Sequence, residues 1–383
     1  MPNYDLTSEQ EMLRNSIREF AEREIKPVRL EIDRNEEFSY DLTGKMFDLG
    51  LFGVTCPAEY GGHGMDYLSY ILIVEELARV DACQAATVAA QNSLGIAPIQ
   101  YFGSKQQKEK YLPMLCTGKK LWGFGLTEPG AGSDAGNSKT NATLKDDQWV
   151  INGSKIFITN AANDWTAGVT VQAVTGESDG RKEISCILVD AGVKGFTSRA
   201  MKNKMTWRSS NTAELYFDDV TVPGDNLLGK RGDGFKQMMQ TLDRGRLSIA
   251  AMGLGGAQGA FEEALKYAKE RKAFGKPISS FQANAFKLAD CAVEIEAARG
   301  LVYKACWLCD QGRPFGKESA MAKLFASEVF HRVANHCVQL HGGYGLMEEY
   351  PAAKFYRDQK LLEIGEGTSE IQRLVIARHL ECF

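Results

Sequence analysis

The stretch L-T-E-P-G-A-G-S-D, residues 126–134, stands where the character of the chain changes from helical to β-rich. Its glycines would let a backbone approach a ligand closely, because glycine has no side chain and adopts unusual backbone angles. Thr127 and Ser133 add hydroxyl groups that can bind ring heteroatoms or phosphate oxygens. An ordinary loop between two domains has the same composition. Taken alone, the stretch is therefore compatible with a ligand site and with a plain connection.

A β-rich segment follows this loop. The apolar runs 148–151 and 155–159 flank Asn152-Gly153, a residue pair typical of a two-residue hairpin turn. Further β-rich runs occur at Val169–Val174, Ile184–Val189 and Ala213–Phe217. This spacing predicts a small antiparallel sheet or barrel over residues 121–225.

The segments on either side are helical. Thr7 and Gln10 have the spacing of a capping box, and apolar residues then recur at helical steps. Similar patterns predict helices at 70–80, 104–115, 279–310 and 321–337. We therefore expect a mainly helical α+β fold in three parts. An N-terminal helical bundle covers residues 1–120, the β domain follows, and a C-terminal four-helix bundle covers residues 226–383.

The overall composition is that of an ordinary globular protein. The 383 residues are 44% apolar and 25% charged, and the formal net charge is −4. An acidic chain has no basic field to attract DNA or RNA, so we expect no nucleic-acid partner. No window approaches the roughly 18 apolar residues that a membrane-spanning helix requires, so we expect no membrane span.

The N-terminus and the cysteines bear on the cellular location. The first residues lack the basic and apolar regions of a signal peptide. Nine scattered cysteines fit reduced thiols better than a disulfide framework. Cys306 and Cys309 form a C-x-x-C, but they lie on an apolar helical stripe, which predicts core packing rather than a metal site. We expect no metal and a cytoplasmic location in a bacterium; a mitochondrial matrix location would require a transit peptide missing from this chain.

Several motifs in register carry a family resemblance. L-T-E-P-G-A-G-S-D resembles the FAD-binding signature of acyl-CoA dehydrogenases, and N-G-S-K-I-F-I-T-N resembles that family's second flavin-contacting strand. The likeness continues through V-P-G-D-N-L-L-G, L-D-R-G-R, E-R-K-A-F-G-K-P-I, Q-L-H-G-G-Y-G and E-G-T-S-E-I-Q-R-L. These motifs occur in family order over essentially the whole chain.

The resemblance implies FAD as the cofactor and assigns contacts in the middle segment. Thr127 and Ser133 would contact the flavin ring edge and the pyrophosphate. Phe157 stands where many relatives have Trp, and it would cover one face of the isoalloxazine. Thr159 would bring its hydroxyl near flavin N5, the atom that receives hydride. Thr368, near the end of the chain, is a further expected FAD contact.

Other cofactor contacts are implied for a neighbouring subunit. Arg271 and Phe274 would reach the FAD of that neighbour, as would Gln339 and Gly343 around the adenosine diphosphate. The family's sites therefore depend on oligomers, usually homotetramers. Without the resemblance, Arg271 is interpreted as a solvated charge at a helix end and Gln339 as an ordinary polar residue.

The resemblance also implies the reaction, an α,β-dehydrogenation of an acyl-CoA thioester to 2-enoyl-CoA. Glu366 matches the family's base, which removes the α-proton while hydride passes from the β-carbon to flavin N5. Gly367 would let the backbone turn so that carboxylate and N–H face the same substrate. A carboxylate closed into an apolar site has a raised pKa, which suits proton abstraction near neutral pH. On local sequence alone, a solvated acid in a loop is the alternative.

Some relatives, such as isovaleryl-CoA dehydrogenase, carry the base on a helix instead. The matching position is Gly245, and glycine cannot serve as a base. Asp243 and Arg246 in the same stretch resemble residues that contact the pantetheine of the substrate. An ion pair at a helix N-terminus is the alternative for these two residues.

One departure from the family bears on the acyl group. Short- and medium-chain members usually have Tyr before the base, whereas this chain has Gly365. The loss of a ring beside the reacting carbons predicts room for a branched or cyclic acyl group, unless a bulky neighbour fills the gap. The expected electron acceptor is an electron-transfer flavoprotein. An acyl-CoA oxidase, an enoyl-CoA reductase and a non-catalytic or DNA-associated relative remain alternatives.

Overall fold

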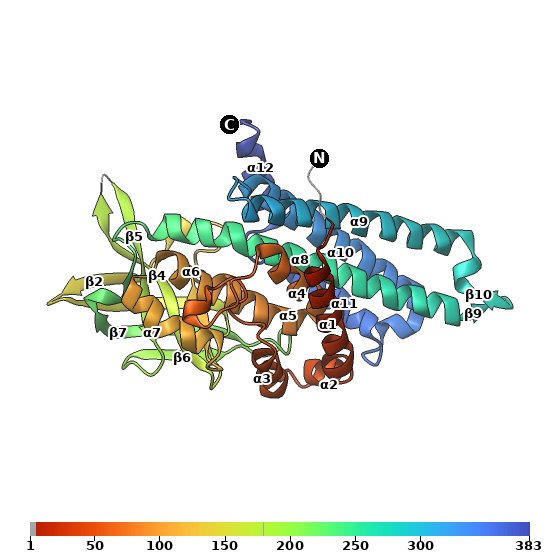
Figure 1. Ribbon diagram of the computed structural model, residues 1–383, viewed down its shortest axis with the longest axis horizontal. Helices are drawn as coiled ribbons and strands as arrows, with labels where there is room; N and C mark the ends of the chain where they lie inside the picture. Colours follow the sequence, from red (N-terminus) through yellow and green to blue (C-terminus); the bar gives the residue numbers. More distant parts are fainter. Residues whose placement is uncertain (1–4, 179) are drawn as a thin grey trace.

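The computed structural model describes residues 5–178 and 180–383, and Figure 1 shows its course. Helices occupy both ends of the chain and a sheet lies between them, so the predicted mainly helical α+β fold is confirmed. The sheet forms one end of an elongated molecule, and long helices extend away from it to the other end.

The N-terminal part is a group of helices, most of which begin at a short polar side chain that caps the first turn. Thr7 and Gln10 form the predicted capping box, and Ser104 and Gln107 form another. The helices are α1 (Ser8–Phe20), α2 (Arg29–Arg34), α3 (Tyr40–Asp48), α4 (Tyr67–Val80), α5 (Ala82–Ala90), α6 (Ala97–Phe102) and α7 (Lys105–Cys116). α4 is buried along nearly its whole length, because it packs between α1 and the C-terminal helix α8.

The middle part is one sheet with the order β6-β7-β3-β2-β4-β5-β8, and β1 also pairs with β4. Its strands are β1 (Leu121–Gly125), β2 (Asn141–Lys145), β3 (Gln148–Thr159), β4 (Thr166–Ser178), β5 (Arg181–Asp190), β6 (Phe196–Ala200), β7 (Thr212–Pro223) and β8 (Leu227–Leu228). Most neighbours are antiparallel as predicted, but β1 and β2 each run parallel to β4. Both parallel pairings join non-consecutive strands, since a parallel pair needs a long crossover rather than a tight turn.

The hairpin turn predicted at Asn152-Gly153 is wrong. β3 runs unbroken through this pair, and the turn falls at Asp146-Asp147, whose φ angles are +46° and +60°. Gly153 is instead an irregularity in the pairing of β3 with β7, with φ +142°. A Cβ there would lie 2.6 Å from Thr140 Oγ1, so the glycine allows β3 to pass close to the residue that precedes β2.

The C-terminal part is helical and is built around α8. α8 (Gly234–Glu270) has 37 residues and packs against α4, α9 and α10. The remaining helices are α9 (Gln282–Asp310), α10 (Gly316–His341), α11 (Pro351–Leu362) and α12 (Ser369–His379), and a small ribbon of β9 (Lys272–Ala273) and β10 (Lys276–Pro277) follows α8. Cys306 is fully buried in this core, as the stripe predicted.

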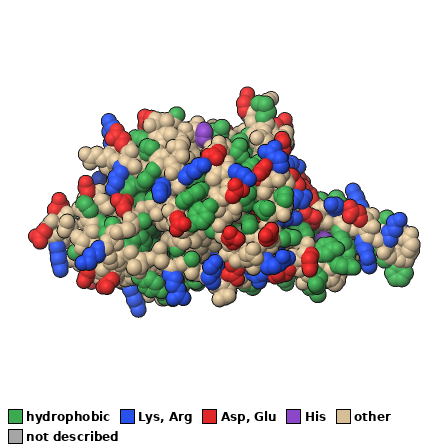
Figure 2. Space-filling view, turned by 90° about the horizontal axis from the view of Figure 1, so that it is seen from below, with side chains coloured by type: hydrophobic (Ala, Val, Ile, Leu, Met, Phe, Trp, Pro, Cys, Tyr) green, Lys and Arg blue, Asp and Glu red, His purple; other side chains and the backbone are tan. Residues whose placement is uncertain are grey.

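The surface carries both signs of charge. Figure 2 shows acidic and basic side chains interspersed over one face of the molecule. Within the part of the chain that the structure describes, no helix is long and apolar enough to cross a membrane.

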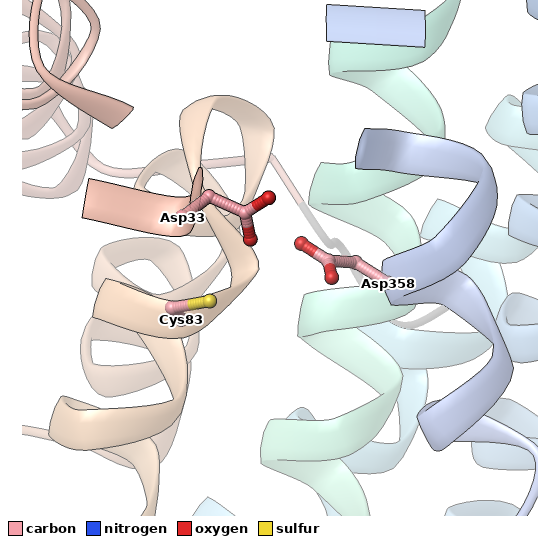
Figure 3. A group of neighbouring side chains, drawn as sticks. All are labelled: Asp33, Cys83 and Asp358. Carbon is pink, nitrogen blue, oxygen red and sulfur yellow. The ribbon is translucent and has the colours of Figure 1, made fainter. Parts of the chain in front are cut away.

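A buried charge cluster joins the N-terminal helices to α11. Figure 3 shows Asp33 of α2, Cys83 of α5 and Asp358 of α11 turned toward one another. A carboxylate oxygen of each aspartate and the sulfur of Cys83 all lie within 4.8 Å of one another. The ammonium group of Lys354 lies among them, 2.5 Å from Asp358, 3.5 Å from Asp33 and 3.4 Å from Asp81. A cation of the chain itself therefore neutralises this acidic group and connects its helices.

Replacing Lys354 with Ala is expected to lower the free energy of unfolding by roughly 3–5 kcal/mol, because it leaves the buried carboxylates of Asp81 and Asp358 without their cation, whereas Asp33 keeps its pair with Arg357. Urea unfolding followed by circular dichroism would measure the loss. The control is Lys105→Ala, which removes an exposed pair to Glu109 at 3.7 Å and should change stability by less than about 0.5 kcal/mol. Equal effects of the two substitutions would contradict the role given to the cluster.

Candidate active site

Glu366 lies in the tight turn that connects α11 to α12, and its carboxylate is turned inward. Its Oε2 atom is buried and has no hydrogen-bond partner among the described residues. Burial raises the pKa of Glu366 to about 7, although the charges of Lys323 and Arg246 act in the opposite direction. An acid group with this pKa can gain or lose a proton near neutral pH.

The carboxylate of Glu366 lies directly over Gly245 of α8. A Cβ at position 245 would be 2.1 Å from Glu366 Oε2, a distance that two non-bonded atoms cannot adopt. The helix position at which some relatives carry the base is thus covered by the acid from the turn. Side chains at positions 245 and 366 would occupy the same space, and in this chain the carboxylate of Glu366 occupies it.

Asp243 and Arg246 form an ion pair, as local sequence suggested, but it lies inside α8 and not at a helix N-terminus. Arg246 Nη1 lies 2.5 Å from Asp243 Oδ1, and Arg246 is buried while its Nε has no partner among the described residues. Burial raises the pKa of Asp243 even though Arg246 opposes the change. The buried guanidinium of Arg246, near Glu366, also has one N–H that is free to donate to a substrate.

Neutral side chains of α4 and of the helical turn that follows α5 (Gln91–Ile96) lie on another side of the acid. Tyr70 donates to the carbonyl of Ala89 at 3.0 Å, and Ser93 donates to the same carbonyl at 2.7 Å. Burial raises the pKa of Tyr70, and the negative charge of Glu366 adds to the effect, so this hydroxyl stays neutral. The side-chain amide of Gln91 donates to the backbone carbonyls of Leu115 and Lys120, so it faces the backbone and not the site.

The glycine-rich loop between β1 and β2 is held by a buried ion pair that sequence reasoning missed. Lys155 of β3 lies 2.8 Å from Glu128 and also donates to the carbonyl of Leu126 at 3.1 Å. Hydrogen bonds from Lys155 and Ser138 lower the pKa of Glu128 to about 2, although burial alone would raise it. The carbonyl of Thr127 accepts from Ile156 N at 2.9 Å, so the loop is attached to β3.

β3 presents an exposed aromatic ring beside this loop. Phe157 is 62% exposed and has φ +61°, an uncommon angle for a bulky residue. Thr127 and Thr159 are half-buried and Ser133 is exposed on the loop. The next residue, Asn160, donates to the carbonyl of Thr87 at 3.1 Å and so connects this end of β3 to α5.

The remaining predicted cofactor contacts lie elsewhere. Arg271 and Phe274 follow the end of α8, Gln339 lies in the last turn of α10, Gly343 follows that helix, and all four are exposed. A helix rises about 1.5 Å per residue, so Arg271 lies about 37 Å from Arg246 along α8. Figure 1 shows β9 and β10 at the end of α8 opposite to the sheet. One chain therefore brings together the residues near Glu366 but not these four.

The turn of Glu366 is bound by two buried side chains that the sequence did not single out. Lys323 donates to the carbonyl of Gly367 at 2.7 Å, and Gln372 donates to the same carbonyl at 2.8 Å. Thr368 caps α12 by accepting from Ile371 N at 3.3 Å, and its side chain also bonds to the carboxylate of Glu370. The sequence does hold a signal for Lys323, because a lysine among Ala320, Ala322 and Ala326 on an apolar helix indicates a buried charge.

The loop and β3 fit the cofactor that the resemblance implies. A flat ring system needs an apolar face, and the exposed ring of Phe157 offers one. Hydroxyls of Thr127 and Thr159 lie on the adjoining segments, and a Cβ at Gly130 or Gly132 would have no neighbour within 4 Å, so the loop backbone is accessible.

Family profiles cover almost the whole chain. They are the acyl-CoA dehydrogenase N-terminal, middle and C-terminal domains, which match residues 7–119, 123–220 and 232–381. The chain therefore belongs to the acyl-CoA dehydrogenase family and is an FAD-dependent oxidoreductase of that family.

Individual relatives agree with this assignment. A probable acyl-CoA dehydrogenase of Bacillus subtilis is 52% identical over 99% of both chains, and the short-chain specific acyl-CoA dehydrogenase of Clostridium acetobutylicum is 46% identical over 98% of both. Butyryl-CoA dehydrogenase of Megasphaera elsdenii matches with a TM-score of 0.96 and 44% identity over 99% of this chain and 100% of its own. A chain solved in work on the electron transferring flavoprotein of Acidaminococcus fermentans matches with a TM-score of 0.96 and 45% identity over 99% of both.

Replacing Gly245 with Ala is expected to lower turnover of acyl-CoA at least about tenfold, because the new methyl group would displace the Glu366 carboxylate. The matched control is Gly300→Ala in α9, where a Cβ would meet nothing within 4 Å. Gly300→Ala should keep full turnover and gain up to about 1 kcal/mol of stability. Full turnover by Gly245→Ala, measured at saturating substrate, would show that the carboxylate does not work from this position.

Proposed function

We propose that Glu366 is the base of this acyl-CoA dehydrogenase and removes the α-proton of a short acyl-CoA thioester. The observation that carries the proposal is the buried, unpartnered Oε2 of Glu366, turned inward against Gly245. An unpartnered carboxylate oxygen in a protein interior is costly, and such groups are concentrated at sites where a proton is transferred.

The protonation state of Glu366 suits this role. Burial disfavours its charged form, and the cations Lys323 and Arg246 favour it, so the pKa settles at about 7. At neutral pH a substantial fraction of the enzyme therefore holds an ionised base. A base of this pKa is also stronger than an exposed glutamate, which increases its tendency to take the weakly acidic α-proton.

FAD is the cofactor, and residues of the middle part would hold it. The ring of Phe157 would cover the isoalloxazine, with the hydroxyls of Thr127, Ser133 and Thr159 as polar contacts and Thr368 as a further contact from the C-terminal part. When bound, FAD supplies an acceptor for the hydride that leaves the β-carbon of the substrate. The buried Glu128–Lys155 pair keeps the glycine-rich loop in place for this binding.

A second subunit would complete the cofactor site. Arg271, Phe274, Gln339 and Gly343 are exposed, and Arg271 lies about 37 Å along α8 from Arg246. Phe274 is 95% exposed, which is unusual for a phenylalanine unless another surface covers it. We propose that these residues contact the FAD of a neighbour in a homotetramer.

The CoA part of the substrate would lie along α8. Asp243 and Arg246 are the proposed pantetheine contacts, and Gly365 and Gly367 border the thioester because they flank the base. The buried Nε of Arg246, which has no partner in the described chain, supports this role for Arg246.

Replacing Glu366 with Gln keeps the shape of the side chain but removes its basicity. The purified variant should stay yellow with bound FAD, and anaerobic addition of butyryl-CoA should no longer bleach the flavin band. We expect turnover to fall by at least about a thousandfold. Bleaching of the flavin band at the wild-type rate would show that a residue other than Glu366 is the base.

The acyl group is proposed to be short and branched or cyclic near the reacting carbons. Gly365 supports this because it has no side chain beside the base, and the space next to it is bordered by Leu361, whose Cδ2 would lie 3.1 Å from a Cβ at position 365. The neutral side chains of α4 and of the helical turn that follows α5 offer hydroxyls and small residues, with no cation between Thr87 and Leu94 to bind a second carboxylate. The short-chain relatives support the short chain length.

Turnover of cyclohexanecarboxyl-CoA, isobutyryl-CoA and butyryl-CoA tests the acyl group. We expect the cyclic or branched substrate to be used best, and Gly365→Tyr to shift the preference toward butyryl-CoA. A clear preference of the unaltered enzyme for butyryl-CoA would refute the enlarged pocket. It would leave the assignment as a short-chain dehydrogenase unchanged.

An electron-transfer flavoprotein is the proposed electron acceptor, and the similarity to a chain studied with such a protein supports it. The nine cysteines all have free thiols, which supports a reducing compartment such as the bacterial cytoplasm.

A further inference from the structure

Lys323 of α10 is a buried lysine without an acidic partner in contact. Its side chain is 0% exposed, and no carboxylate of the described chain lies within ion-pair distance of its Nζ. Its ammonium group donates to the carbonyl of Gly367 at 2.7 Å. Lysine is almost never fully buried unless it is paired. The charge of Lys323 therefore lies against the turn that holds Glu366.

The charged groups around Lys323 come from three elements. Glu366 and Glu363 lie in and before the turn, Glu370 begins α12, and all three attract the ammonium group, while Arg246 of α8 repels it. Burial outweighs the attraction and lowers the pKa of Lys323 to about 8. The ammonium form thus predominates at neutral pH, although less completely than on a surface.

Lys323 differs from the other cation near Glu366. Arg246 contacts Asp243 at 2.5 Å, and this carboxylate offsets much of its charge. Lys323 has only a carbonyl in contact, so its field toward Glu366 is not cancelled nearby. Of the two cations that favour the ionised form of Glu366, Lys323 has the larger effect on its pKa. The hydroxyl of Tyr70, on the α4 side, is neutral and adds no charge.

The backbone at this turn needs support. Glu366 has φ +52° and Gly367 has φ +92°, so two successive residues are in the left-handed region. That region costs a residue with a side chain roughly 1–2 kcal/mol. Lys323 and Gln372 both donate to the carbonyl of Gly367, and Gln372 also donates to the carbonyl of Glu366 at 3.3 Å. Only one of these two anchors is charged.

We propose that Lys323 is a positioning residue whose buried ammonium group holds the Glu366–Gly367 turn and favours the ionised form of the Glu366 carboxylate. The proposal rests on the function of Glu366 as the base. Lys323 does not contact the substrate in this role. It acts through the carbonyl of Gly367 and through its charge, whereas Gln372 supplies an anchor without a charge.

The pair of variants Lys323→Met and Gln372→Leu separates charge from anchoring. Both remove a donor to the carbonyl of Gly367, and only the first removes a cation. We expect the acid limb of the pH profile of kcat/KM to move up by about one unit in Lys323→Met, a loss of roughly tenfold at pH 6 that is recovered at pH 9. Gln372→Leu should lower kcat at all pH values and leave the limb in place.

A direct readout of Glu366 accompanies the kinetics. Difference infrared titration of the protonated carboxyl band, assigned by its loss in Glu366→Gln, reports the ionisation of this side chain without turnover. The band should titrate about one unit higher in Lys323→Met than in the unaltered protein. Lys323→Gln, which keeps a donor but no charge, should show the same shift and replaces Lys323→Met if that variant does not fold.

Failure of this inference is distinguishable from failure of the proposed function. Wild-type turnover by Glu366→Gln would remove the base and with it the reason for the inference. An inactive Glu366→Gln together with an unmoved acid limb and infrared band in both Lys323 variants would overturn the role of Lys323 alone. An equal shift in Gln372→Leu would also overturn it, because the effect would then not come from charge.

Discussion

The cost of holding a carboxylate away from water is the constraint on which the site depends. A buried charge is tolerated only when cations, hydrogen bonds or a shared proton compensate it. Around Glu366 the compensation is partial, since one oxygen has no partner and two cations lie nearby without direct contact. A fully paired Glu366 would be a stable structural anion and a weak base. Incomplete compensation keeps it close to the point of protonation.

Each part of the chain contributes one side of the site, and buried polar contacts hold the sides together. Asn160 at the end of β3 bonds to the carbonyl of Thr87, so the sheet and α5 are coupled. Tyr70 bonds to the carbonyl of Ala89 two residues further on. The cluster around Lys354 joins the same helices to α11, which leads directly into the turn of Glu366. Packing between the three parts is therefore also what sets the geometry of the base.

Local features of the sequence predicted much of this arrangement. The capping box at Thr7 and the apolar stripes gave helices close to their observed limits, because both depend on residues a few positions apart. The turn at Asn152-Gly153 was wrong because the same pair also suits an irregularity in a continuous strand, and only pairing with β7 distinguishes the two. The neighbouring Asp146-Asp147 supplied the real turn.

Features that depend on distant contacts were not predictable in this way. Nothing near Lys323 in the sequence indicates that its ammonium group meets the carbonyl of Gly367, 44 residues later. The same holds for the Glu128–Lys155 pair, whose members are 27 residues apart. Motifs identified which residues belong to the site, whereas the compensation of their charges became visible only in three dimensions.

The contact between Gly245 and Glu366 has a consequence for how such enzymes can diverge. The carboxylate occupies the volume that any side chain at position 245 would need. An acid at position 245 and the glutamate of the turn would therefore crowd each other unless one of them swung aside. Moving the base from the turn to the helix would thus favour exchanging the two residues together, with a small residue at whichever position gives up the acid.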